Sequence, residues 1–241
     1  MGPSFLENGT DKESSVTLSS WVIVSTPVAA LLAVLFFAWR YVRRGTTAIH
    51  RAAALGNVAR LKQLLLASPE SVNHLDMIGF SPLQQAAYWG QAETARLLLE
   101  HKAALTVDQG LSPLHHAASG GHEDVVGLLL EHGADVNVKS PSDDSTPLHC
   151  AVINRRADVA RQLLDAGADI NAITKSGWTA CHFAASNGDE VCMALLLEHN
   201  ADWQSLNAGD ESPLQLALAN GHPKIVELVQ QLEIQPSANN G

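Results

Sequence analysis

The sequence contains only three cysteines, and none of them forms a C-x-x-C pair. Cys150, Cys181 and Cys192 therefore indicate neither a disulfide framework nor a thiolate metal site, and so sparse a set is typical of a reducing compartment. Positive charge is also scarce, because 15 lysines and arginines stand against 25 acidic residues and the formal net charge is -10. Since this balance repels phosphate, we expect no nucleic-acid partner.

Motifs of catalysis are missing as well. The sequence has no G-x-S-x-G and no phosphate-binding glycine loop, and His122-Glu123 is followed by Val126 where H-E-x-x-H would need histidine. We therefore expect no enzymatic activity, no cofactor, no metal site and no small-molecule substrate. A hydrolase or metal enzyme built on the 11 histidines is the remaining hypothesis of that class.

One long run is free of charge. The 19 residues from Trp21 to Trp39 contain no acidic or basic side chain, and a helix of that length reaches about 28 Å, close to the roughly 30 Å hydrocarbon core of a membrane. The run predicts a transmembrane helix over residues 20–40, preceded by a disordered tail (1–19) and followed by a basic juxtamembrane linker (41–45). A cleaved signal peptide fits less well, because acidic residues precede the run and bulky ones follow it.

The basic residues after this run predict its orientation. Arg40, Arg43 and Arg44 favour a single-pass protein with the N-terminus outside and the remainder in the cytoplasm. In the tail, Asn8-Gly9-Thr10 matches a glycosylation acceptor pattern, and the sequence leaves its use open.

From Thr47 onward the chain repeats itself. A tetrapeptide recurs at intervals of 31 to 34 residues, and each copy is followed by small residues and then by a leucine-rich run. The copies are Thr47-Ala48-Ile49-His50, Ser81-Pro82-Leu83-Gln84, Ser112-Pro113-Leu114-His115, Thr146-Pro147-Leu148-His149, Thr179-Ala180-Cys181-His182 and Ser212-Pro213-Leu214-Gln215.

Each copy predicts two short antiparallel helices. Serine or threonine is suited to the N-cap and proline to the first helical position, while leucine and valine recur at helical spacing in the second half. Gly133 and Gly167 stand where a left-handed residue ends the second helix, Asn200 tolerates that conformation, and Lys102 is expected to be strained there. Because one pair cannot bury its own apolar face, neighbouring pairs must stack into a solenoid.

These residues closely resemble the ankyrin repeat family, most fully in residues 111–138 and 146–172. The resemblance implies an all-α solenoid of about six helix pairs over residues 46–232, with short β-hairpin fingers along one edge. In the whole chain we expect the transmembrane helix before this solenoid and a disordered tail (233–241) after it. The resemblance also implies that His50, His115, His149 and His182 hydrogen-bond to neighbouring backbone. The short interval between Ser81 and Ser112 predicts a notch in the row of fingers at residues 107–111.

The resemblance further implies that partners meet the fingers and the exposed residues of the first helices. In this sequence those positions carry an unusual number of apolar residues, which we predict to bind protein: Met77, Ile78, Phe80, Tyr88, Trp89, Leu111 and Trp178. The alternative is that some of them pack between fingers or cover a gap. Residues 45–241 are acidic overall, which favours a basic partner.

We therefore expect a membrane-anchored scaffold or adaptor that binds another protein on the cytoplasmic side. The alternative is an accessory subunit of a membrane enzyme or transporter, recruited through its transmembrane helix. The sequence does not identify the partner, the organism, the membrane, the pathway or the oligomeric state.

Overall fold

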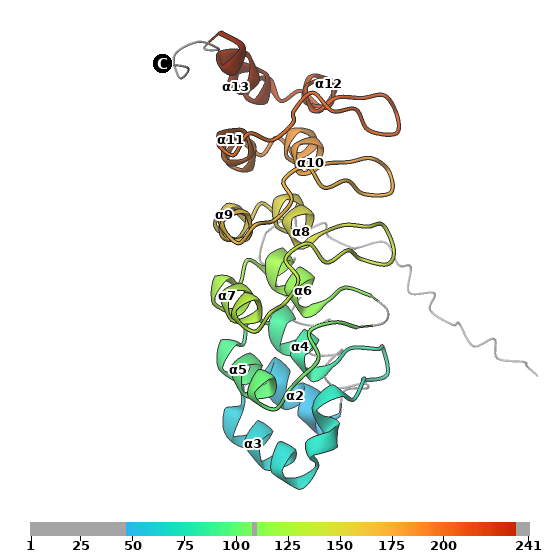
Figure 1. The fold of residues 1–241 in the computed structure, drawn as a ribbon, viewed down its shortest axis with the longest axis vertical. Coiled ribbons are helices and arrows are strands. Elements are labelled where there is room, and N and C mark those ends of the chain that lie inside the picture. Colours follow the sequence, from blue (N-terminus) through green and yellow to red (C-terminus); the bar gives the residue numbers. More distant parts are fainter. Residues whose placement is uncertain (1–46, 108–109, 235–241) are drawn as a thin grey trace, which may run out of the picture. The chain divides into compact units, whose positions relative to one another are not determined.

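The computed structural model describes residues 47–107 and 110–234. These residues form six helix pairs stacked in chain order, with the loops before the first helix of successive pairs projecting from one side (Figure 1). The first helices of the pairs are α2 (Ala48–Ala54), α4 (Pro82–Tyr88), α6 (Pro113–Gly120), α8 (Pro147–Ile153), α10 (Ala180–Asn187) and α12 (Pro213–Ala219). The second helices are α3 (Val58–Ala67), α5 (Ala92–Glu100), α7 (Glu123–Glu131), α9 (Ala157–Asp165), α11 (Glu190–Glu198) and α13 (Pro223–Ile234).

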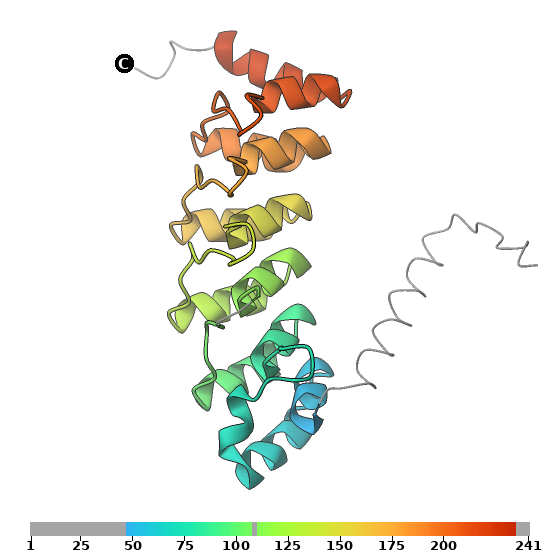
Figure 2. The same ribbon diagram turned by 90° about the vertical axis from the view of Figure 1, so that its right-hand side faces the viewer.

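The helices lie in two layers. The first helices of neighbouring repeats pack on one another and form an inner layer next to the projecting loops, and the second helices form an outer layer (Figures 1 and 2). A 3-10 helix, η1 (Pro69–Asn73), follows α3. The expected solenoid of about six helix pairs is therefore confirmed.

The repeated tetrapeptide starts the five inner helices from α4 to α12 through a reciprocal pair of hydrogen bonds between its first and fourth residues. In α10 the Thr179 backbone N–H donates to His182 Nδ1 (3.1 Å), and the Thr179 hydroxyl lies 2.8 Å from the same nitrogen. In α4 glutamine replaces histidine, and the Ser81 N–H donates to Gln84 Oε1 (2.7 Å). Both residue types therefore satisfy backbone groups that a helix start would leave unpaired.

The core lies between the two layers. The tetrapeptide leucines Leu83, Leu114 and Leu148 are fully buried, and so are outer-layer residues such as Leu98 and Leu129. Full burial of one such side chain stabilises the fold by about 2 kcal/mol. Small inner-helix residues such as Ala86 and Ala87 are also fully buried and allow the inner helices to approach closely.

The ends of the outer helices agree with the expectation from sequence. Gly133 and Gly167 have φ values of 86° and 89°, and Asn200 and Lys102 have values of 60° and 62°. Lys102 therefore adopts the strained left-handed conformation that the sequence predicts.

The expected β-hairpin fingers need a correction, because no strand occurs within residues 47–107 and 110–234. The loop before α4 is closed by a single backbone pair, from the Asp76 N–H to the Phe80 carbonyl (2.8 Å), around a turn from the Gly79 N–H to the Asp76 carbonyl. The loop before α10 is closed in the same way, from the Thr174 N–H to the Trp178 carbonyl (3.0 Å). So few paired groups do not make a ladder, and we call these loops fingers without assigning strands to them.

Several expectations concern residues outside the described ranges 47–107 and 110–234. The N-terminal tail, the transmembrane helix at 20–40 and the basic linker at 41–45 all lie there. Within the described residues, no helix combines the length and the apolar character that a membrane crossing requires. At the other end, α13 extends to Ile234 and so includes two residues that the sequence assigns to the C-terminal tail.

Candidate protein-binding surface

The finger before α4, residues 73–80, is organised by one buried carboxylate. Asp76 Oδ1 accepts hydrogen bonds from the backbone N–H groups of Ile78 (3.1 Å) and Phe80 (2.9 Å), and Asp76 Oδ2 accepts one from Gln85 Nε2 (3.1 Å). These bonds fix the turn and tie it to α4. The finger therefore presents Met77 and Ile78 at its tip, where 82% and 55% of their surfaces are exposed.

Beside this finger, four rings form a continuous row across the inner layer. The ring centroids of Phe80 and His116 are 5.0 Å apart, those of His116 and Tyr88 5.8 Å, and those of Tyr88 and Trp89 5.1 Å. We call Phe80, His116, Tyr88 and Trp89 the aromatic row. It runs from the base of the finger to the end of α4, and Tyr88 is 51% exposed.

A groove of about 930 Å³ lies between this finger and the loop that precedes α6. Its floor and walls include Ile78, Phe80, Val107, Leu111 and His116. The groove occurs where the short interval between Ser81 and Ser112 predicts a notch. We call it the finger groove.

The structure thus brings together most of the residues that the sequence selects. Ile78, Phe80 and Leu111 line the finger groove, Tyr88 and Trp89 continue the aromatic row, and Met77 stands at the finger tip. Trp178 belongs to a different cluster. Its ring packs against Phe183 (4.9 Å between centroids) and His182 (5.9 Å) at α10, three repeats after α4.

Two residues of this surface are missed by the sequence interpretation. Gln85 and His116 directly follow the residue that caps α4 and α6, and both are buried. His116 Nε2 is buried and has no hydrogen-bond partner within the described residues. Burial lowers the pKa of His116 to about 4, with a smaller contribution from His115, so the ring is neutral at physiological pH. The pair His115-His116 is visible in the sequence, but its contacts with Phe80 and Tyr88 depend on the neighbouring repeat.

The capping histidines bind backbone, as the family resemblance implies. Because the backbone N–H of residue 112 or 179 donates to Nδ1, the proton of each neutral ring lies on Nε2. His115 Nε2 therefore donates to the Ser145 carbonyl (2.9 Å) and His182 Nε2 to the Glu211 carbonyl (3.1 Å), each in the next finger. His50 Nε2 likewise lies 2.8 Å from the Phe80 carbonyl. His149 differs, since its Nε2 has no partner within hydrogen-bonding geometry.

Metal binding and thiol chemistry set requirements for the histidines, acidic residues and cysteines of the described residues. No group of three or more histidine, cysteine or acidic residues that could hold a metal occurs in the described part of the chain. All three cysteines are buried and free. Burial raises the pKa of the Cys150 and Cys181 thiols to about 12, and it also raises that of Cys192, so none of them is a reactive thiolate.

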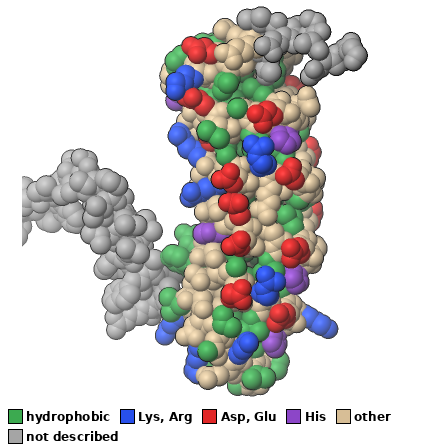
Figure 3. Space-filling model, turned by 90° about the vertical axis from the view of Figure 1, so that its left-hand side faces the viewer, with side chains coloured by type: hydrophobic (Ala, Val, Ile, Leu, Met, Phe, Trp, Pro, Cys, Tyr) green, Lys and Arg blue, Asp and Glu red, His purple; other side chains and the backbone are tan. Residues whose placement is uncertain are grey.

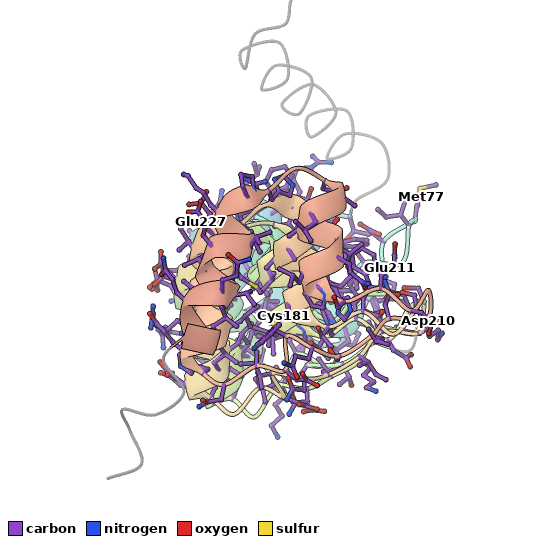
Figure 4. All side chains as sticks on the ribbon, turned by 90° about the horizontal axis from the view of Figure 1, so that it is seen from above. Met77, Cys181, Asp210, Glu211 and Glu227 are labelled. Carbon is purple, nitrogen blue, oxygen red and sulfur yellow. The ribbon has the colours of Figure 1, made fainter. Side chains whose placement is uncertain are left out.

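Charge is unevenly distributed around the stack. On the outer-layer face, acidic and basic side chains are interspersed along the length of the stack (Figure 3). The fingers differ from one another, since the segment 201–211 before α12 contains Asp202, Asp210 and Glu211 and no lysine or arginine. Viewed along the stack, Met77, Asp210 and Glu211 lie on the finger side, whereas Glu227 lies on the opposite side (Figure 4).

Comparison with known proteins assigns the family. A sequence model described as ankyrin repeats (3 copies) matches residues 31–109, 101–174 and 171–240. The chain therefore belongs to the ankyrin repeat family, whose members are typically non-enzymatic and bind other proteins.

Similarity to individual proteins is local. The chain is 42% identical over 62 residues to protein phosphatase 1 regulatory subunit 12A of Mus musculus, and equally to that of Rattus norvegicus. The aligned part is 26% of this chain and 6% of each relative. The match thus concerns a small part of the curated relatives.

Proposed function

We propose that this protein is a membrane-anchored adaptor that holds a partner protein on its finger side. The observation that carries the proposal is the exposure of Met77 and Ile78 on a finger whose backbone is fixed by Asp76. Exposed apolar side chains on a rigid loop lose little conformational freedom on binding, and aromatic anchors beside them supply contact area.

The partner is a protein with basic residues. The described part of the chain carries more acidic than basic side chains, and the finger at 201–211 has only acidic ones. Such a surface accelerates encounter with a positively charged partner and makes the association sensitive to salt. Nucleic acid and small-molecule substrates do not fit this surface.

Membrane attachment forms the second half of the proposal. It is supported by the uncharged run from Trp21 to Trp39 and by the basic residues that follow it. Residues 20–40 span the membrane once, the N-terminus lies outside, and the repeats lie in the cytoplasm.

We propose no catalytic activity for the repeats themselves. Their thiols are protonated, and the histidines of known tautomer are committed to backbone hydrogen bonds. We therefore propose that the protein functions by binding its partner protein and not by catalysis.

A second candidate is an accessory subunit of a membrane enzyme or transporter, recruited through its transmembrane helix. The local similarity to a protein named as a phosphatase regulatory subunit favours a role in an enzyme complex. Replacement of residues 20–40 by polyleucine separates the two candidates. Partner capture survives this replacement if the repeats select the partner, and it is lost if the span does.

The finger surface is tested by crosslinking in the native membrane. A photoreactive residue at Met77 should crosslink to one discrete partner, whereas the same residue at Glu227, on the opposite side, should not. The double variant Met77→Asp/Ile78→Asp should reduce capture at least tenfold, with Leu66→Asp as the control, because Leu66 is a similarly exposed (79%) apolar residue of α3. Equal crosslinking from both sides, or equal loss in the control, would place the binding surface elsewhere.

The anchor is tested by alkaline extraction of membranes. The full chain should stay in the pellet, and Val34→Arg/Leu35→Arg should release it, because two charges in the middle of the span make insertion unfavourable. Recovery of the unaltered chain in the supernatant would contradict the membrane anchor. Protease added from outside should leave the repeats intact.

A further inference from the structure

We infer that the finger side binds one extended peptide segment that carries a large uncharged side chain and, about nine residues away, a pair of basic residues. The uncharged side chain enters the finger groove, and the basic residues meet the finger at 201–211. This inference rests on the proposed adaptor function and adds the chemistry and the spacing of the segment that is held.

The finger groove selects an uncharged group. Its described lining residues include the apolar side chains of Leu75, Ile78, Phe80, Val107 and Leu111. The only carboxylate of the neighbouring finger, Asp76, is buried and accepts three hydrogen bonds. An aromatic or long aliphatic side chain would gain contact with Ile78, Phe80 and Leu111.

The groove is large enough for such a guest. Its volume of about 930 Å³ exceeds what one aromatic side chain needs, so the flanking backbone of an extended segment also has room. His116, at the inner wall, adds a neutral ring with one nitrogen that lacks a partner.

The far end of the finger side selects positive charge. Asp202, Asp210 and Glu211 form no ion pair with any basic side chain of the described residues. The two intervening fingers, residues 134–145 and 168–178, carry four acidic and two basic side chains. One of those basic residues, Lys175, lies 3.9 Å from Asp144 and donates to the Pro141 and Ser142 carbonyls. The finger before α12 has three acidic side chains and no basic one, so the attraction for a basic guest is strongest there.

The spacing follows from helix packing. Packed helices lie roughly 8–10 Å apart, and three to four such steps separate the groove between the fingers of α4 and α6 from the finger of α12. The span is therefore roughly 30 Å. An extended chain advances about 3.3 Å per residue, so about nine residues separate the two anchor points.

The test uses fluorescein-labelled peptides and the full chain in detergent micelles, with binding followed by fluorescence anisotropy. The probe contains one tryptophan and two arginines separated by nine uncharged residues, and it is made in both chain directions. Comparison peptides have a spacer of three residues, serine in place of tryptophan, or glutamine in place of both arginines. We expect one direction of the nine-residue probe to bind at least tenfold more tightly than every comparison peptide.

Two variants of the protein assign the ends of the probe. Ile78→Ser should weaken the nine-residue probe about tenfold and leave the serine peptide unaffected, whereas Val191→Ser on α11 should change neither. Asp210→Asn/Glu211→Gln should weaken the probe by a similar factor and reduce its salt dependence, whereas Asp165→Asn/Glu131→Gln on the outer helices should not.

Other outcomes overturn the inference. Binding that depends on arginine alone, or that is equal for both spacers, would show that the groove and the acidic finger do not act on one segment. Failure of every peptide, together with discrete crosslinking from Met77, would also overturn it while leaving the adaptor function intact. Loss of that crosslinking would reject the adaptor function itself.

Discussion

At the residue scale, the residue that follows the capping histidine or glutamine of each inner helix shows whether a buried side chain serves packing or binding. The residue that follows the capping histidine or glutamine is Gln85, His116, Cys150, Phe183 or Leu216 in successive repeats from α4 on. Gln85 bonds to Asp76, and the last three are apolar or weakly polar. Only His116 in this series combines burial with an unpartnered ring nitrogen. This series shows that an apolar side chain fits the position.

We therefore expect His116→Leu to raise the free energy of unfolding by about 0.5 to 1 kcal/mol. The variant removes a buried polar group without a partner, which costs about 1–3 kcal/mol, and it gives up ring contacts with Phe80 and Tyr88 that contribute less. Urea denaturation of the full chain in detergent, followed by circular dichroism, measures the change.

The control is His182→Leu, which should lower the same free energy by about 2 kcal/mol. It leaves the Thr179 N–H and the Glu211 carbonyl without their partner. If His116→Leu destabilises the protein as strongly as His182→Leu, the His116 ring serves packing and not recognition.

At the scale of elements, the four outer helices α5, α7, α9 and α11 are each followed by one residue in the left-handed conformation. Gly133 and Gly167 meet this requirement without a side chain, whereas Lys102 meets it at the end of α5 with φ of 62°. The Lys102 side chain is exposed, so it gains no packing contacts that would offset the cost of this conformation. The end of α5 is therefore a point at which the stack stores strain.

We expect Lys102→Gly to raise the free energy of unfolding by about 1 kcal/mol, since a left-handed conformation costs a non-glycine residue about 1–2 kcal/mol and the flexibility of glycine in the unfolded chain offsets part of the gain. Asn200→Gly is the matched control, and its effect should be smaller because asparagine tolerates this conformation. The same urea titration measures both. A larger gain at Asn200 than at Lys102 would contradict the explanation.

The elements could be predicted from sequence because their signals are local. Serine or threonine before proline starts the inner helices, and leucine spacing defines the outer ones. The fingers could not be predicted in the same way, since a strand depends on the number of paired backbone groups, and the Asp76–Phe80 loop provides one pair. The ring contacts of His116 and the distance of Trp178 from the other selected residues could not be predicted from the sequence either, because they depend on how the repeats stack.

At the scale of the whole molecule, neutral histidines join three of the described repeats to the next one. His115 and His182 reach from one inner helix to the finger of the following repeat, and His50 does so at the first pair. Burial lowers the pKa of each of these rings. The stack therefore depends at these three junctions on imidazoles that stay uncharged.

This dependence predicts that the protein loses stability in mild acid. Burial lowers the pKa of His149 to about 4, although Asp143 and the carbonyls of Ala172 and Trp178 partly oppose the effect. Because the folded pKa lies below the unfolded value of 6.5, the stabilisation is complete above pH 6.5 and is lost as the pH falls toward 4. A ring with these two values contributes a loss of about 2 kcal/mol between pH 7 and pH 5.

The matched variant is His149→Gln, because Gln84 shows that an amide can replace the capping imidazole without titrating. Urea midpoints of the full chain in detergent at pH 7 and pH 5 should differ less in this variant than in the unaltered protein, by about 2 kcal/mol when converted to free energy. If His149→Gln retains the full acid sensitivity, groups other than this capping imidazole control the stability of the stack in acid.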